Sequence, residues 1–141
     1  HLDDALADDT VRCIVVTNEG SVFCAGADLV AVGALADHGI ALPDVFRQVQ
    51  ANPKPTVARI AGHCRGGGVG LAAAFDISIA AHDVSFAFSE ARLGVAPAVI
   101  SVVCLPKMRR ADASDGVAFG PMRPTAGSVA RLQCRKVRRA T

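Results

Sequence analysis

The residue types best suited to chemistry are a run of glycines and one carboxylate further along the chain. Gly66-Gly67-Gly68 leads into Leu71-Ala72-Ala73-Ala74-Phe75, which contains good helix formers. The N–H groups at a helix start have no partner within the helix, and the helix dipole adds positive potential there. The pattern predicts a site for an anion or a developing oxyanion. Close packing of a helix on a sheet is an alternative explanation of the same glycines.

Two nucleotide-binding motifs are excluded by the residues around this loop. A P-loop ends in Gly-Lys-Ser/Thr, whereas Gly68 is followed by Val69 and Gly70. A dinucleotide fingerprint, G-x-G-x-x-G, counted from Gly66 places Leu71 at its last position. The loop therefore predicts an oxyanion site more readily than a phosphate site.

A second loop of small residues, Cys24-Ala25-Gly26-Ala27-Asp28, also follows an apolar segment. Two loops that end strands can bring backbone N–H groups to one oxygen, which is how an oxyanion hole is built from backbone alone. Glu90, just after another apolar segment, is the candidate for proton transfer. The residues alone leave open a second interpretation, in which Glu90 is a surface carboxylate or pairs with Arg92.

The elements that must position these residues follow an α/β pattern. Short β-branched runs alternate with helical segments and glycine turns, which favours strands packed against helices. A loop of small residues is expected from Val22 to Leu29, and a glycine-rich loop from Gly62 to Gly70. The expected strands are 11–17, 56–61, 76–81 and 84–88, and the expected helices are 2–9, 44–51 and the segment after Gly70.

The composition limits the class of protein. The chain has 141 residues, about half of them apolar, so a packed core is expected. Its five Cys are scattered with no Cys-x-x-Cys pair, which indicates neither a disulfide framework nor a metal site. No apolar run could span a bilayer and the acidic N-terminus resembles no signal peptide, so a cytoplasmic protein without membrane contact is expected.

Charge divides the chain into two parts. Up to Pro106 there are six basic and eleven acidic residues, and from Lys107 to Thr141 there are nine basic and two acidic. Glycines and prolines interrupt any period in the second part, so residues 109–141 are predicted to be a poorly ordered basic tail. The tail contains no nucleic-acid motif, so specific nucleic-acid binding is not expected.

Four segments together resemble the crotonase (enoyl-CoA hydratase/isomerase) family, in matching order and spacing. The closest similarity in wording is to bacterial methylglutaconyl-CoA hydratase-like members. The resemblance implies an α/β fold, a partial crotonase-like spiral of ββα units over residues 1–108, truncated at both ends. The segments are Phe23–Leu29, Lys54–Gly62, Gly66–Gly68 with Asp76-Ile77, and Phe86–Pro97.

The resemblance also implies a function and its residues. The substrate would be an acyl-CoA thioester of fatty-acyl or branched-chain metabolism, with no cofactor other than the coenzyme A that the substrate carries. The N–H groups of Ala27 and Gly67 would hold the thioester oxygen, and Glu90 would be the acid/base. The coenzyme A would lie along Ala25, Gly26, Ala27, Asp28 and Leu29. A homotrimer or hexamer is the implied assembly.

One position decides between reactions within the family. Family hydratases usually carry a second Glu two residues after the glycine triplet, where this chain has Gly70. Hydration of an enoyl-CoA is the leading expectation, and isomerisation by Glu90 alone is the alternative. A third possibility is an inactive fragment whose basic tail binds anions nonspecifically.

Overall fold

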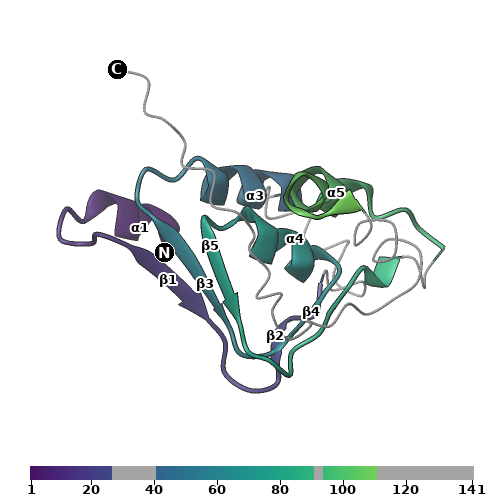
Figure 1. The fold of residues 1–141 in the computed structure, drawn as a ribbon. Coiled ribbons are helices and arrows are strands. Elements are labelled where there is room, and N and C mark those ends of the chain that lie inside the picture. Colours follow the sequence, from purple (N-terminus) through teal and green to yellow (C-terminus); the bar gives the residue numbers. More distant parts are fainter. Residues whose placement is uncertain (27–40, 91–93, 111–141) are drawn as a thin grey trace.

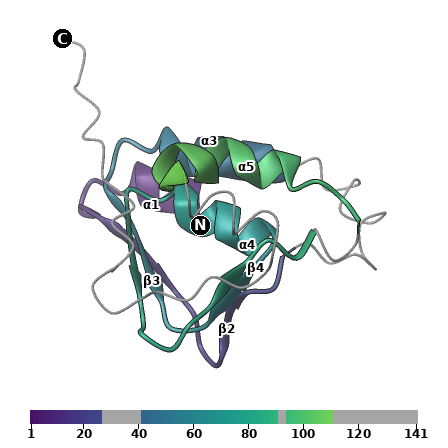
Figure 2. The ribbon, with the colours of Figure 1, turned by 45° about the vertical axis from the view of Figure 1, so that its right-hand side comes forward.

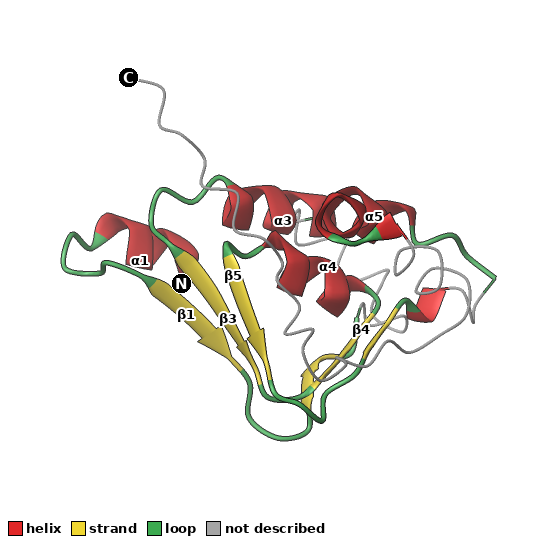
Figure 3. Ribbon diagram, viewed as in Figure 1, coloured by secondary structure: helices red, strands yellow, loops and turns green. Residues whose placement is uncertain are grey.

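The computed structural model describes residues 1–26, 41–90 and 94–110. These residues form two parallel sheets of three strands, with β1-β3-β5 in one and β2-β4-β6 in the other (Figures 1 and 3). The strands are β1 Ile14–Thr17, β2 Val22–Cys24, β3 Thr56–Ile60, β4 His63–Arg65, β5 Ile77–Ala80 and β6 Phe86–Ala87. The helices are α1 Leu2–Ala7, α3 Leu42–Gln50, α4 Gly67–Ala74 and α5 Ala98–Cys104, followed by the 3₁₀ turn η3 Leu105–Lys107.

Each strand of the first sheet is followed in the chain by a strand of the second. The connection from β3 to β4 is only Ala61-Gly62, where a side chain on Gly62 would lie 2.6 Å from the backbone carbon of Ser21. The two sheets meet along these connections and diverge like a V, with α4 between them (Figure 2). This arrangement places the ends of β2, β4 and β6 beside the start of α4.

Helix α4 can lie this deep because it is built almost entirely of glycine and alanine. All of its residues except Leu71 are buried. Helices α3 and α5 contact its outer side, as both ribbon views show. The core cluster draws on all of these layers, including Phe46 on α3, Ile60 on β3, Phe75 after α4 and Ile100 on α5.

The sheet β1-β3-β5 follows the period of two expected of strands. In β3, Ala58 and Ile60 are fully buried whereas Arg59 is exposed. On the same outer face Val15, Ile77 and Ile79 are 60%, 44% and 56% exposed. The core therefore lies entirely on the helix side of this sheet.

One polar pair joins the starts of β3 and β5. The carboxylate of Asp76 accepts hydrogen bonds from the N–H and the hydroxyl of Thr56, both at 2.8 Å. The Thr56 hydroxyl in turn accepts a bond from the Asp76 N–H at 3.1 Å. Because Thr56 is completely buried, water cannot replace these partners.

The substitution Asp76→Ala is therefore expected to lower the free energy of unfolding by roughly 2–3 kcal/mol, the cost of leaving buried donors unpaired. Urea unfolding followed by circular dichroism measures this change. The control is Asp83→Ala, which removes an exposed carboxylate from the same part of the chain. Equal stability of the two variants would contradict the structural role given to Asp76.

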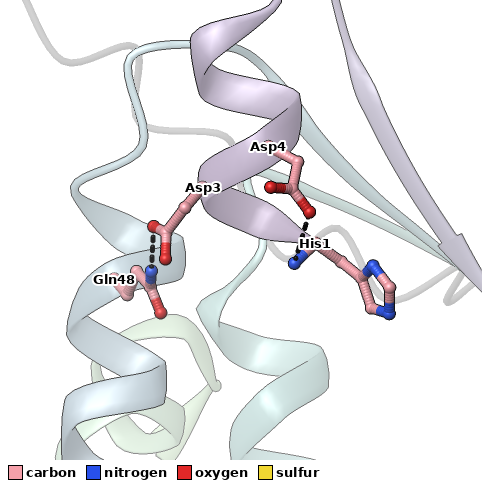
Figure 4. A network of polar contacts seen from close by, with 4 residues as sticks. All are labelled: His1, Asp3, Asp4 and Gln48. Atoms are coloured by element: carbon pink, nitrogen blue, oxygen red, sulfur yellow. Dashed lines mark hydrogen bonds and ion pairs between the residues drawn. The ribbon is translucent and has the colours of Figure 1, made fainter.

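Polar contacts at the surface fix the start of α1 and join it to α3 through Gln48 (Figure 4). The Gln48 side-chain amide donates to Asp3 at 2.9 Å, and the terminal amine of His1 pairs with Asp4 at 3.2 Å. Lys54 Nζ donates to the carbonyls of Ala5 and Asp8, both at 2.7 Å, and so caps the end of α1.

The structure corrects several sequence-based expectations. Val22–Cys24 was expected within a loop but forms β2, and His63–Arg65, within the expected glycine-rich loop, forms β4. These strands are only three residues long, too short to show an alternation of apolar and polar residues in the sequence. They form by pairing with each other. Strand β1 begins at Ile14 rather than residue 11, and α5 was not anticipated. The predicted poor order of residues 111–141 lies outside the described residues.

No helix in the described part of the chain is long and apolar enough to cross a membrane.

Candidate active site

The glycine loop begins where β4 ends and turns sharply into α4. Gly66 has φ +48° and ψ −123°, a backbone conformation that residues with a side chain rarely adopt. A Cβ at Gly66 would lie 3.0 Å from Ser89 Oγ and 3.3 Å from Glu90 Oε1. The Glu90 carboxylate therefore lies directly against the bare Cα of Gly66, at the start of α4.

The second loop contacts the first at the same place. A Cβ at Gly26, where φ is +100°, would lie 3.2 Å from Arg65 O and 3.6 Å from Gly67 N. A Cβ at Gly68 would lie 2.6 Å from Cys24 O. Cys24 and Cys64 are register partners in the paired strands β2 and β4, which explains why the loops after them meet. The two loops therefore lie next to each other at the start of α4, as far as Gly26.

The donor at this junction is the N–H of Gly67. Gly67 is the first residue of α4, so its N–H has no acceptor within the helix, and the dipole of α4 favours negative charge there. The other predicted donor, the N–H of Ala27, lies outside the described residues. The same is true of Asp28, Leu29 and Arg92.

The Glu90 carboxylate is partly enclosed by the protein. Its side chain is half-buried, and Oε2 is buried without a hydrogen bond to any residue that the structure describes. Nearby on α5, burial raises the pKa of the Cys104 thiol to about 12, and the charge of Glu90 adds to this shift. A buried carboxylate oxygen without a partner is costly in a protein interior, and here the carboxylate lies beside Gly66 at the start of α4.

At the next turn of α4, Gly70 is covered by apolar side chains instead of a carboxylate. A Cβ at Gly70 would lie 2.5 Å from Phe46 Cζ and 2.9 Å from Ile100 Cγ2. The position at which the resemblance implied a second Glu in hydratases is therefore covered by the ring of Phe46. Sequence reasoning singled out Gly70 but missed Phe46, whose only signal was its place on the buried face of a helix.

No metal site accompanies these residues. Among residues 1–26, 41–90 and 94–110, no three His, Cys, Asp or Glu side chains are grouped closely enough to bind an ion. The described part of the site therefore consists of one carboxylate beside the backbone N–H groups at the start of α4.

Comparison with known proteins assigns this arrangement to a family. A model of the enoyl-CoA hydratase/isomerase family matches residues 1–117. The chain belongs to this family. The family and the α/β fold of crotonase type predicted from the sequence are therefore confirmed.

Relatives within the enoyl-CoA hydratase/isomerase family include bacterial and fungal proteins. A Thermus thermophilus protein named as an enoyl-CoA hydratase is 34% identical over 122 residues, which cover 81% of this chain and 48% of that protein. Enoyl-CoA hydratase AKT6-1 of Alternaria alternata is 43% identical over 94 residues, covering 65% of this chain and 32% of that protein. The chain spans less than half the length of these two relatives.

Solved structures of the family also match most of this chain. The crystal structure of an enoyl-CoA hydratase from Mycobacterium avium is 39% identical with a TM-score of 0.76, over 87% of this chain and 49% of that one. A crotonase structure from Legionella pneumophila is 35% identical with a TM-score of 0.80, over 93% of this chain and 54% of that one.

Proposed function

We propose that this chain carries the acyl-CoA site of an enoyl-CoA hydratase/isomerase, in which Glu90 moves a proton to or from a carbon next to the thioester. The N–H groups of Gly67 and Ala27 would hold the thioester oxygen. Removal of the α-proton, or addition to the conjugated double bond, places negative charge on that oxygen as an enolate. One such N–H donor is typically worth roughly 3–4 kcal/mol of barrier.

The observation that carries this proposal is the placement of Glu90 against Gly66. Glu90 Oε1 is 3.3 Å from the Cβ position of Gly66, and the next residue, Gly67, begins α4 and would supply the N–H donor to the oxyanion. A proton-transfer group and an oxyanion donor therefore serve neighbouring atoms of one bound thioester. A surface carboxylate would be solvated, whereas Oε2 of Glu90 is buried without a hydrogen bond to any described residue.

The remaining features of the proposal follow the family. Ala25, Gly26, Ala27, Asp28 and Leu29 would line the coenzyme A, and no other cofactor would be required. We propose a cytoplasmic enzyme of fatty-acyl or branched-chain acyl-CoA metabolism that assembles as a trimer or hexamer. Hydration and isomerisation share the enolate step, so both are compatible with this site.

The test is hydrogen–deuterium exchange at the α-carbon of an acyl-CoA thioester, such as butyryl-CoA, by the purified chain in heavy water. Mass spectrometry measures the deuterium gained. Exchange above the rate of the buffer supports the proposed function. A folded chain that gives no exchange, whether or not its basic tail binds anions, would show that the chain is an inactive fragment.

A further inference from the structure

Two cysteines lie on neighbouring strands, just before the two loops that meet at the start of α4. Cys24 is the last residue of β2 and Cys64 is the middle residue of β4, and the two are register partners. Paired strands lie about 4.8 Å apart, which is within the range of about 4.4–6.8 Å between the Cα atoms of a disulfide. The backbones are therefore already close enough for a bond between these side chains.

Both thiols point toward the core side of this sheet. A Cβ at Gly68 of α4 would lie 3.0 Å from Cys24 Sγ, so the Cys24 side chain faces α4. Cys64 is completely buried and belongs to the hydrophobic core, whereas its neighbours His63 and Arg65 are only partly buried. Helix α4 contacts both strands and lies between the two sheets (Figure 2). The two side chains therefore share the space next to α4.

The two thiols differ in their access to solvent. Cys24 is partly exposed, whereas Cys64 is completely buried. Burial raises the pKa of the Cys64 thiol to about 12, and the nearby Cys24 adds to this shift. A dissolved oxidant can therefore reach Cys24 first, and Cys64 can react only with a group on its neighbour.

We infer that Cys24 and Cys64 are an oxidative modification site, which a hydroperoxide closes to a disulfide and a thiol reductant opens again. Both cysteines are free thiols in the structure. Cys24 supplies the thiol that meets the oxidant, and Cys64 supplies the thiol that resolves the oxidised sulfur. The pairing of β2 with β4 holds the two residues together, so neither has to leave its strand.

The reaction consumes one hydroperoxide and balances in two steps. The thiolate of Cys24 attacks a peroxide oxygen, so an S–O bond forms, the O–O bond breaks and the sulfur is oxidised to a sulfenic acid. Hydroxide or alkoxide leaves with the electron pair and takes up the proton that Cys24 released. The Cys64 sulfur then attacks the Cys24 sulfur and the S–S bond forms. The sulfenic hydroxyl leaves as water with the thiol proton of Cys64.

Closure of the disulfide has a consequence for catalysis, which rests on the proposed function. Bonded sulfurs lie about 2 Å apart, so Cys24 must turn from Gly68 toward Cys64. Gly26 follows two residues later, and a Cβ there would lie 3.6 Å from Gly67 N. This contact places the first loop beside the proposed oxyanion donor. The disulfide should therefore lower α-proton exchange at least about ten-fold, since complete loss of such a donor costs about a hundred-fold or more.

The test starts with the reduced, folded chain and an excess of hydrogen peroxide. Remaining thiols are then alkylated, and the chain is digested without reductant by trypsin and a glutamate-specific protease. Cleavage after Glu19 separates Cys13 from Cys24, so mass spectrometry reads each cysteine separately. The expected product is a pair of peptides joined through Cys24 and Cys64, which lacks two hydrogen atoms. This pair should form in step with the loss of exchange, and dithiothreitol should reverse both.

Two variants separate the effect of the pair from the effect of burial. Cys64→Ala removes the resolving thiol, so no linked pair should form and Cys24 should stop at the sulfenic or sulfinic stage. Cys104→Ala is the matched control, because Cys104 is also buried and burial raises the pKa of its thiol to about 12. It should keep the link between Cys24 and Cys64 and the accompanying loss of exchange. Each variant is compared with its own reduced form, so a lower starting activity does not affect the comparison.

The inference would be overturned by peroxide that oxidises the exposed Cys13 while Cys24 and Cys64 stay unlinked in the folded chain. A fully linked chain whose exchange equals that of the reduced chain would overturn the effect on catalysis. A reduced chain without any exchange is a different result, because the proposed function then fails while the linked peptides still decide whether the thiol pair reacts.

Discussion

The substitution Glu90→Gln is expected to lower the rate of α-proton exchange at least about a hundred-fold and up to about ten-thousand-fold, the range that a positioned acid/base contributes. Glutamine has nearly the same shape, so the contacts with Gly66 and Ser89 can persist while the basic oxygen is lost. The measurement is deuterium incorporation into butyryl-CoA by mass spectrometry. The oxyanion donor at Gly67 remains, so thioester binding should change little.

The matched control for this variant is Asp83→Asn, which removes an exposed carboxylate seven residues earlier. It should leave exchange within about two-fold of the unsubstituted rate, since an exposed charge at a distance is screened by solvent. Exchange that survives in Glu90→Gln within ten-fold would assign the proton transfer to another group, and the role of Glu90 would be wrong. Circular dichroism of both variants would show that the fold is retained.

The substitution Gly68→Ala is expected to destabilise the fold by about 3 kcal/mol, at the upper end of what overpacking a core costs. The added Cβ would lie 2.6 Å from Cys24 O and 2.7 Å from Cys24 Cβ. A backbone carbonyl cannot move by changing a rotamer, so β2 must separate from α4. The rate of α-proton exchange by the molecules that remain folded should also fall. The loop that follows Cys24 contacts Gly67 through Gly26, so a shift of Cys24 would displace that contact.

Urea unfolding gives the stability of this variant, and Gly20→Ala is its control. Gly20 has φ +73° with no atom within 4 Å of its Cβ position, so alanine there meets only the cost of a left-handed backbone, about 1–2 kcal/mol. A Gly68→Ala variant that is no less stable than Gly20→Ala would mean that the contact between α4 and Cys24 is looser than described.

Part of the site could be predicted from the sequence because its determinants are local. A glycine triplet before an alanine-rich helix specifies the loop, and Glu90 after an apolar segment is visible as the nearby acid. The same local patterns predicted β3 and β5 to within one residue at each end, whereas α4 begins at Gly67 and not after Gly70. That Glu90 lies against Gly66 is a contact between the segment after β6 and the residue before α4, which no local pattern encodes.

The parts that were missed depend on pairing and packing between distant segments. Strands β2 and β4 are each three residues long and form because they lie next to each other, 39 or more residues apart in sequence. Phe46 looks like any core residue of an amphipathic helix until its contact with Gly70 is known. The position of Ala27 in the oxyanion hole and the boundary at residue 108 stay predictions.

The composition of α4 has a consequence for the order of folding. Gly67, Gly68 and Gly70 each lower helix propensity by about 1 kcal/mol relative to alanine, so α4 has little tendency to form alone. It is stabilised only by burial between the two sheets and beneath α3 and α5. The N–H donor of Gly67 is therefore oriented only when these elements have docked. Loss of activity on mild denaturation should coincide with global unfolding, because this site has no separately stable substructure on which to persist.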